Sequence, residues 1–148
     1  MNNRLKTIVD LERYPIQDLN SPKIKETIKK CKNDLDKFSC TTISNFILFE
    51  SLKIMNAELK KHINEVYMSK ESINAYLYSK DDSSLPKDHP KRIFMDRDNG
   101  YLNSDLFEKD SEMKFLYEQD ELLKFVSACL GVTPIYRWAD PLACHAYN

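Results

Sequence analysis

The three histidines of the chain are the first residues to consider as metal ligands: His62, His89 and His145. A facial metal site uses two histidines and one carboxylate, and a His-x-Asp or His-x-Glu pair on one strand would supply two of these ligands. Neither His89 nor His145 is followed two positions later by an acid. His62 has Glu58 and Glu65 at helical spacing, but such pairs are typical of a solvated helix surface. The sequence therefore predicts no metal site.

Other catalytic templates are also incomplete. The four cysteines form no CxxC pair and match no zinc spacing, and most lie in apolar surroundings that favour buried thiols: Cys31, Cys40, Cys129 and Cys144. A nucleophile pair of Cys144 with His89 stays open but has no positive support. The chain contains no GxGxxG, P-loop or GxSxG sequence.

Two amphipathic helices are predicted in the first half of the chain. Ser21-Pro22 has the form of an N-cap followed by proline at the first helical position. Apolar residues then recur at helical spacing in two stripes, Ile24, Ile28, Cys31, Leu35 and Phe38, and Leu48, Leu52, Met55, Leu59, Ile63 and Val66. Both stripes are interpreted as core packing.

The second half contains two further predicted helices. One begins at a cap formed by Ser104 or Asp105 and runs toward Tyr117. The other runs from about Asp120 to Leu130, with Gly131 as its C′ residue. Its inward-facing residues are expected to be Leu122, Val126, Cys129 and Leu130.

Extended segments complete the predicted elements. Residues 39–47 are β-branched and polar, which predicts a short strand or an extended entry into the next helix, and residues 73–78 alternate, which predicts a strand. Residues 81–90 form a polar loop with two prolines. Residues 133–148 are expected to hold two extended segments separated by Asp140-Pro141. No repeat or linker interrupts the chain, so residues 1–148 are expected to form a single unit.

Composition limits the function further. The 148 residues are 42% apolar and 30% charged with a net charge of −1, which indicates a globular protein without a surface for nucleic acid or anionic membrane. Neither a signal peptide nor an apolar run of about 20 residues occurs, which favours the cytoplasm. With two glycines only, the chain is expected to be mostly helical or to lack the turn-rich part of its fold.

Two segments carry a resemblance to a known family. The first is Ala75-Tyr76-Leu77 followed by Leu85-Pro86-Lys87-Asp88-His89-Pro90-Lys91-Arg92. The second is Leu116-Tyr117, with Leu122, Phe125 and Leu130-Gly131, leading into Tyr136-Arg137-Trp138-Ala139-Asp140-Pro141-Leu142. In order and spacing these segments resemble the N-terminal half of bacterial iron(II)/2-oxoglutarate-dependent oxygenases that hydroxylate or halogenate free amino acids such as lysine.

The resemblance implies an α+β fold in which N-terminal helices pack on the beginning of a double-stranded β-helix of the jelly-roll or cupin type. The barrel is expected to be incomplete in this chain. Members of the family carry a Trp-His-x-Asp or Trp-His-x-Gly iron motif shortly after the second segment, and the chain ends at Asn148 before such a motif. Fe(II) and 2-oxoglutarate are therefore expected for the complete enzyme, with none bound by this chain alone, which is expected to be inactive.

The resemblance also implies substrate contacts. Asp140 is expected to bind the ammonium of a basic amino acid while Arg137 binds its carboxylate; a structural pair between Arg137 and Asp140 is the equal alternative. Asp120 or Glu121 would supply a second carboxylate, although for Asp120 capping of the following helix is favoured. Trp138 is expected to shape the pocket or to pack in the core. The loop around His89 would act as a lid or simply hold an extended turn before Pro90.

Two interpretations remain open. In the first, the complete enzyme activates oxygen with iron and 2-oxoglutarate and removes hydrogen from an unactivated carbon. The choice between hydroxylase and halogenase then depends on a residue outside this chain. In the second, the chain is a non-catalytic module that binds a ligand or a partner. An unpaired strand edge would favour a complementary chain or a strand-exchanged homodimer.

Overall fold

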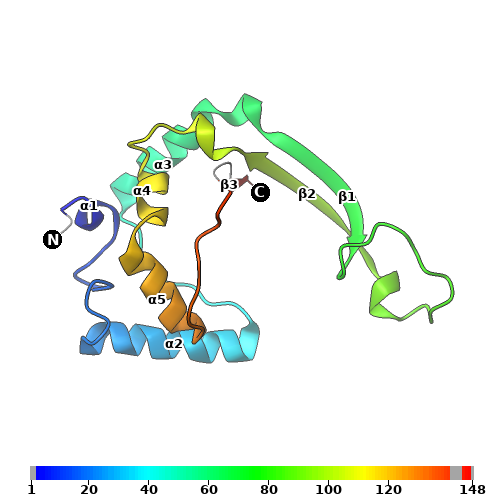
Figure 1. Cartoon of the computed structure of the whole chain (residues 1–148), viewed down its shortest axis with the longest axis horizontal. Helices are drawn as coiled ribbons and strands as arrows, with labels where there is room; N and C mark the ends of the chain where they lie inside the picture. Colours follow the sequence, from blue (N-terminus) through cyan, green and yellow to red (C-terminus); the bar gives the residue numbers. More distant parts are fainter. Residues whose placement is uncertain (1–2, 141–144, 148) are drawn as a thin grey trace. The chain divides into compact units, whose positions relative to one another are not determined.

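A computed structural model of the chain describes residues 3–140 together with the backbone of residues 145–147. The described residues form an α+β fold, which confirms the predicted class (Figure 1). They divide into two compact units, a helical unit within Met1–Lys61 and Phe107–Pro141 and a sheet unit within His62–Leu106 and Leu142–Asn148. The assignment of both units to one domain stays a prediction.

Each helix and strand lies within one of the two units. The helical unit contains α1 (Leu5–Ile8), α2 (Pro22–Phe38), α3 (Phe49–Lys61), α4 (Glu112–Tyr117) and α5 (Asp120–Leu130). The sheet unit contains β1 (Tyr67–Asn74), β2 (Phe94–Leu102), β3 (His145–Tyr147) and the 3-10 turns η1 (Ile63–Glu65), η2 (Pro90–Arg92) and η3 (Ser104–Leu106).

Local signals place the ends of α2 and α5. Helix α2 begins at Pro22 after the extended residue Ser21, as predicted. Helix α5 ends at Leu130, and Gly131 follows in the left-handed conformation at φ 69° with its N–H donating to the Ser127 carbonyl. Glycine suits this position because it lacks the Cβ that disfavours positive φ. Both predicted boundaries are confirmed.

The predicted apolar faces are only partly correct. Phe38 at the end of α2 is 72% exposed, although Ile24 and Cys31 are buried. On α5 the buried residues are Phe125 and Cys129, whereas Val126 and Leu130 are exposed. On α3 Met55 is buried and Leu52 is exposed, and Ile63, which was predicted to continue the same stripe, is exposed in the 3-10 turn η1. Helical periodicity selects a broad stripe, and the neighbouring elements determine which edge of that stripe is covered.

One core cluster joins the helices of the helical unit. Its buried members are Leu5, Ile8, Val9, Tyr14, Ile16, Ile24, Cys31, Met55, Leu116, Phe125 and Cys129. Helices α2 and α5 pack against each other, and Cys31 and Cys129 are both buried free thiols in this cluster. Burial beside Cys31 raises the pKa of the Cys129 thiol to about 12, so this thiol stays protonated and unreactive at neutral pH.

Two predictions in the helical unit were wrong. Residues 39–47 contain no strand; Ile47 makes only an isolated bridge with Val9, and the left-handed residues Ser39 and Asn45 interrupt an extended path. The cap of α4 is Ser111 rather than Ser104 or Asp105. The Ser111 hydroxyl accepts from the Lys114 N–H at 3.4 Å and donates to Glu58 of α3 at 2.9 Å.

The sheet unit is built on a long antiparallel pair. Strands β1 and β2 pair from Tyr67 opposite Tyr101 to Asn74 opposite Phe94, and β3 adds to β2, giving the order β1-β2-β3. The strand predicted at residues 73–78 was wrong in position, because the chain turns immediately after Asn74. The described strands do not close into a barrel, and the jelly-roll identity stays a prediction.

Candidate functional site

Arg137 is held against the corner between α4 and α5 in the helical unit. Its Nε donates to the Tyr117 carbonyl at 3.1 Å, and its Nη2 donates to the Glu118 carbonyl at 2.9 Å. The same Nη2 pairs with Oδ1 of Asp120 at 2.7 Å. The Arg137 side chain is 28% exposed, so three acceptors from one corner hold a largely covered guanidinium. This contact fixes the extended segment that leads to Asp140.

Asp120 is the ion-pair partner of Arg137 and not a helix cap. The N-cap of α5 is Gln119, so Asp120 is the first helical residue and the predicted capping role was wrong. The hydrogen bond and charge of Arg137 lower the pKa of the Asp120 carboxyl below its ordinary value. The positive end of the helix dipole also stabilises a carboxylate in the first turn of the helix.

The side chains on either side of Arg137 are exposed to solvent. Tyr136 is 82% exposed and Trp138 is 72% exposed, so the alternative core role of Trp138 was wrong. The Trp138 N–H donates to the Tyr117 hydroxyl at 2.8 Å, which adds a backbone anchor while the indole stays accessible. A pocket-shaping role for Trp138 stays a prediction.

Asp140 lies on the exposed side of the same segment. Asp140 lies three residues after the anchored Arg137. The sequence predicted a break at Asp140-Pro141, and Pro141 lies outside the described residues. Sequence reasoning named Arg137, Asp120, Trp138 and Asp140 but assigned no role to Tyr117, which contributes both a carbonyl and a hydroxyl to this corner. Its position at the end of a predicted helix was the one available signal.

Replacement of Arg137 by alanine should loosen the segment without unfolding the helical unit. The change removes three donors from the corner, so we expect the amide protons of residues 136–140 to exchange roughly five-fold faster in hydrogen–deuterium exchange. Lys124→Ala, on an exposed position of α5, removes the same charge and serves as the control. Equal exchange in both variants would show that the Arg137 contacts do not hold the segment.

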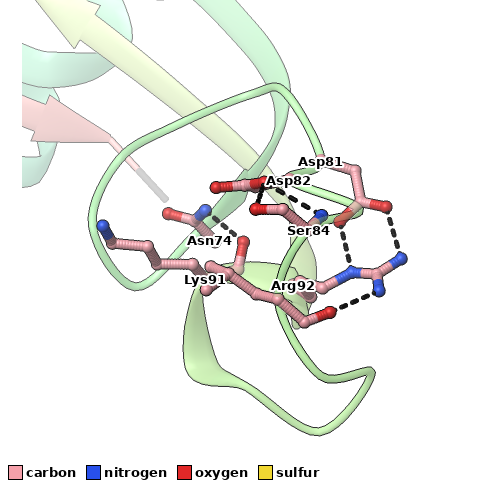
Figure 2. A network of polar contacts seen from close by, with 7 residues as sticks. Asn74, Asp81, Asp82, Ser84, Lys91 and Arg92 are labelled. Atoms are coloured by element: carbon pink, nitrogen blue, oxygen red, sulfur yellow. Dashed lines mark hydrogen bonds and ion pairs between the residues drawn. The ribbon is translucent and has the colours of Figure 1, made fainter.

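The loop between β1 and β2 contains the first of the two segments that carry the resemblance. Arg92 donates through Nε and Nη2 to the two carboxylate oxygens of Asp81 at 2.8 and 2.7 Å, and through Nη1 to the Leu85 carbonyl at 2.9 Å (Figure 2). Its side chain is 18% exposed. The bidentate pair raises the pKa of Arg92 and lowers that of Asp81. Arg92, near the end of the loop, therefore holds the part of the loop that contains Asp81 and Leu85.

Asn74 organises the other side of the same loop. It is 2% exposed and donates from Nδ2 to the Lys91 carbonyl at 2.6 Å. Its Oδ1 accepts the N–H groups of Tyr76 and Tyr78 at 2.9 and 3.1 Å, and Leu77 between them adopts φ 64°. The loop is thus an ordered structure despite its length. Loops of this length without secondary structure are uncommon unless they have a function.

His89 has a local structural role in this loop. It is extended at φ −66° and ψ 135°, as expected for a residue before proline, and its Nδ1 accepts the Lys91 N–H at 3.2 Å. The suggested partner Cys144 lies outside the described residues. A lid role for the loop stays a prediction.

The described side chains, residues 3–140, form no group of three or more His, Cys, Asp or Glu that could hold a metal ion. His62 Nδ1 contacts Glu65 at 2.8 Å in the sheet unit. In the helical unit Glu58 accepts the hydroxyl of Ser111. The His145 side chain lies outside the described part.

The described helices include none with the length and apolar character required to cross a membrane. Comparison of the chain with protein-family models, with curated proteins and with solved structures gave no match.

Proposed function

We propose that this chain forms the substrate-side part of an iron(II)/2-oxoglutarate-dependent oxygenase that acts on a free basic amino acid. The observation that carries the proposal is the anchoring of Arg137 by Tyr117, Glu118 and Asp120. This anchoring holds a short exposed segment with an acidic residue, Asp140, and an accessible aromatic residue, Trp138. A carboxylate next to an aromatic surface suits a substrate with an ammonium group and an alkyl chain.

The anchoring changes the role that we propose for Arg137. Two of its three guanidinium nitrogens donate to the protein itself, so Arg137 serves to position Asp140. Asp140 then provides the ion pair with the substrate ammonium. Asp120 acts through Arg137 and balances its charge, rather than serving as a second carboxylate for the substrate.

Iron and 2-oxoglutarate would supply the oxidising chemistry of such an enzyme. The described residues provide no ligand set for the iron, so its ligands would come from residues that the structure does not describe. The part proposed for the described residues is to bind and orient the amino acid. Free thiols at Cys31 and Cys129 agree with the reducing cytoplasm as the proposed location.

Asp140→Asn should weaken binding of L-lysine to the purified chain by about tenfold, because the substitution removes the charge from the proposed ion pair. Isothermal titration calorimetry would measure the dissociation constant, with circular dichroism to show that the variant is folded. Asp36→Asn, at an exposed position of α2, removes the same charge and should leave binding unchanged. Norleucine, which lacks the side-chain ammonium, should bind the wild-type chain and Asp36→Asn more weakly than lysine does, and in Asp140→Asn this difference between the two ligands should largely disappear.

Unchanged lysine binding in folded Asp140→Asn would contradict the substrate role of Asp140. The family assignment has a separate test, because the coding sequence after the codon for Asn148 should contain Trp-His-x-Asp or Trp-His-x-Gly. Its presence would support the oxygenase, and a different continuation would contradict it.

A second candidate function is partner binding without catalysis. The observation in its favour is the number of exposed apolar residues in the sheet unit, which include Tyr67, Met68, Leu77, Ile93 and Met95. Exposed apolar surface of this kind marks contact sites in many proteins. Sedimentation velocity would test whether the chain forms a homodimer, and a monomer at all concentrations would count against strand exchange.

A further inference from the structure

A groove of about 650 Å³ lies in the helical unit, and its lining includes none of the residues that hold Arg137. Three segments line it: α2, the loop before α2 and the loop after α2. The lining residues are Arg13, Tyr14, Lys23, Glu26, Thr27, Lys30, Thr42, Ile43 and Ser44. Because three separate parts of the chain converge here, the groove depends on the tertiary structure.

The lining carries more positive than negative charge. Arg13, Lys23 and Lys30 are cationic, and Glu26 is the one carboxylate among the lining residues. The chain as a whole has a net charge of −1, so this local excess is not a property of the overall composition. Lys23 also lies in the first turn of α2, a helix of 17 residues whose N-terminal dipole adds positive potential.

Contacts within the protein hold the cations around the groove. The guanidinium of Arg13 lies 5.5 Å from the centre of the Tyr14 ring, and Lys23 Nζ donates to the Glu12 carbonyl at 3.1 Å. Neither of these contacts involves a carboxylate, so neither neutralises the charge. Lys30 Nζ pairs with Asp34 at 2.6 Å and also donates to the Thr42 carbonyl at 3.3 Å.

Tyr14 makes the groove a preformed feature. Its side chain is 7% exposed, and its hydroxyl donates to the Ser44 carbonyl at 2.7 Å, which ties the loop before α2 to the loop after it. The ring also packs near Phe46, with 5.7 Å between ring centres. A groove whose walls are already linked in the free protein loses less conformational entropy when a ligand binds.

We propose that this groove binds a phosphorylated small molecule, with the phosphate among Arg13, Lys23 and Lys30. A phosphate monoester carries a charge of about −1.5 to −2 at pH 7 and three acceptor oxygens, which matches several converging cations better than a single carboxylate does. The volume of the groove falls within the range of small-molecule sites. The hydroxyl-bearing residues Thr27 and Ser44 line the same space and suit the polar remainder of such a ligand.

Titration of the folded chain with pyrophosphate tests the proposal. Nuclear magnetic resonance would monitor the titration, with sodium chloride keeping the ionic strength constant. We expect saturable shifts of the amide signals of residues 13, 23, 27 and 30. The double variant Arg13→Ala/Lys23→Ala should bind about tenfold or more weakly, because it removes two charge-assisted contacts. Lys29→Ala/Lys32→Ala, on positions of α2 that do not line the groove, removes the same charge.

Equal weakening in both double variants, or shifts that do not saturate, would overturn the proposal in favour of non-specific charge attraction. A second measurement uses inorganic phosphate, whose monoanion loses its second proton near neutral pH. Its binding should strengthen between pH 5.5 and pH 7.5 as the dianion forms, and pH-independent binding would contradict the site. The groove shares no residue with the segment of Asp140, so this result and the lysine titration are independent.

Discussion

Phe125→Ala should lower the free energy of unfolding by about 3–5 kcal/mol, the cost typical of removing a buried phenylalanine. Phe125 is 3% exposed and belongs to the core cluster of the helical unit. Its ring stacks on Phe46, with 5.8 Å between ring centres and 10° between ring planes. The substitution loses apolar burial, leaves a cavity where α5 packs on its neighbours and removes an aromatic contact.

Urea unfolding followed by circular dichroism would measure the effect. Phe38→Ala is the matched control, because it removes the same side chain from a helix position that is 72% exposed. That control should change stability by less than about 0.5 kcal/mol. If the two substitutions cost the same, the burial of Phe125 and the assignment of the core face of α5 would both be wrong.

Arg92→Ala should open the loop between β1 and β2. The substitution removes the bidentate pair with Asp81 and the bond to the Leu85 carbonyl. Hydrogen–deuterium exchange should become about thirtyfold faster for the amides of Leu85 and His89, which donate to carbonyls within the loop. Lys91→Ala is the control, since it removes the same charge from the neighbouring residue but leaves its backbone carbonyl as the acceptor for Asn74.

Arg92→Lys distinguishes charge from geometry. Lysine keeps the positive charge but cannot make the planar two-point contact with Asp81, so most of the protection should still be lost. Full protection in Arg92→Lys would show that charge alone holds the loop.

Acidification should have a similar effect on the wild-type loop. The pKa of Asp81 in the folded chain is lowered by Arg92 from its ordinary value of 3.8. The contribution of the ionised pair is therefore present at and above about pH 5 and is lost as pH falls through the lowered pKa. Exchange of the loop amides, corrected for the intrinsic pH dependence of exchange, should accelerate only in that acidic range.

The signals that predicted structure well were local ones. The start of α2 depends on Ser21 and Pro22, and the end of α5 depends on Gly131. Pro22 acts through its fixed φ and missing N–H donor and Gly131 through its missing Cβ, each on the backbone within one turn, whereas the Ser21 side chain makes no capping hydrogen bond. No other part of the fold is needed to produce the effect, so these boundaries could be predicted.

The failures involve residues whose partners are distant in the sequence. Residues 39–47 looked extended, but the chain there turns, and its β-pairing is limited to the isolated bridge between Ile47 and Val9. The alternating residues after Ile73 looked like a strand, but the chain turns there, because the Asn74 side chain donates to the Lys91 carbonyl, 17 positions on, and accepts the N–H groups that follow it. A short alternating run is equally compatible with a strand and with a turn, and the surrounding contacts select between them.

The candidate site shows the same difference between what the sequence predicts and what the tertiary structure determines. Sequence alone singled out Arg137, Asp120, Trp138 and Asp140 as polar or aromatic residues that suit an amino-acid ligand. The tertiary structure paired Arg137 with Asp120, 17 positions away, and exposed Trp138. An arginine can reach several carboxylates within its flexible length, and only the folded backbone determines which one lies at hydrogen-bonding distance.

The sequence by itself determined the α+β class, the start of α2, the end of α5 and the residue types available for binding. Tertiary structure alone decided which helix faces are buried, where the strands pair, which anion Arg137 binds and that a cationic groove forms around Tyr14. The physical reason is the range of the interactions. Backbone conformational preferences act over a few residues, whereas burial and ion pairing depend on groups that folding brings together from distant positions.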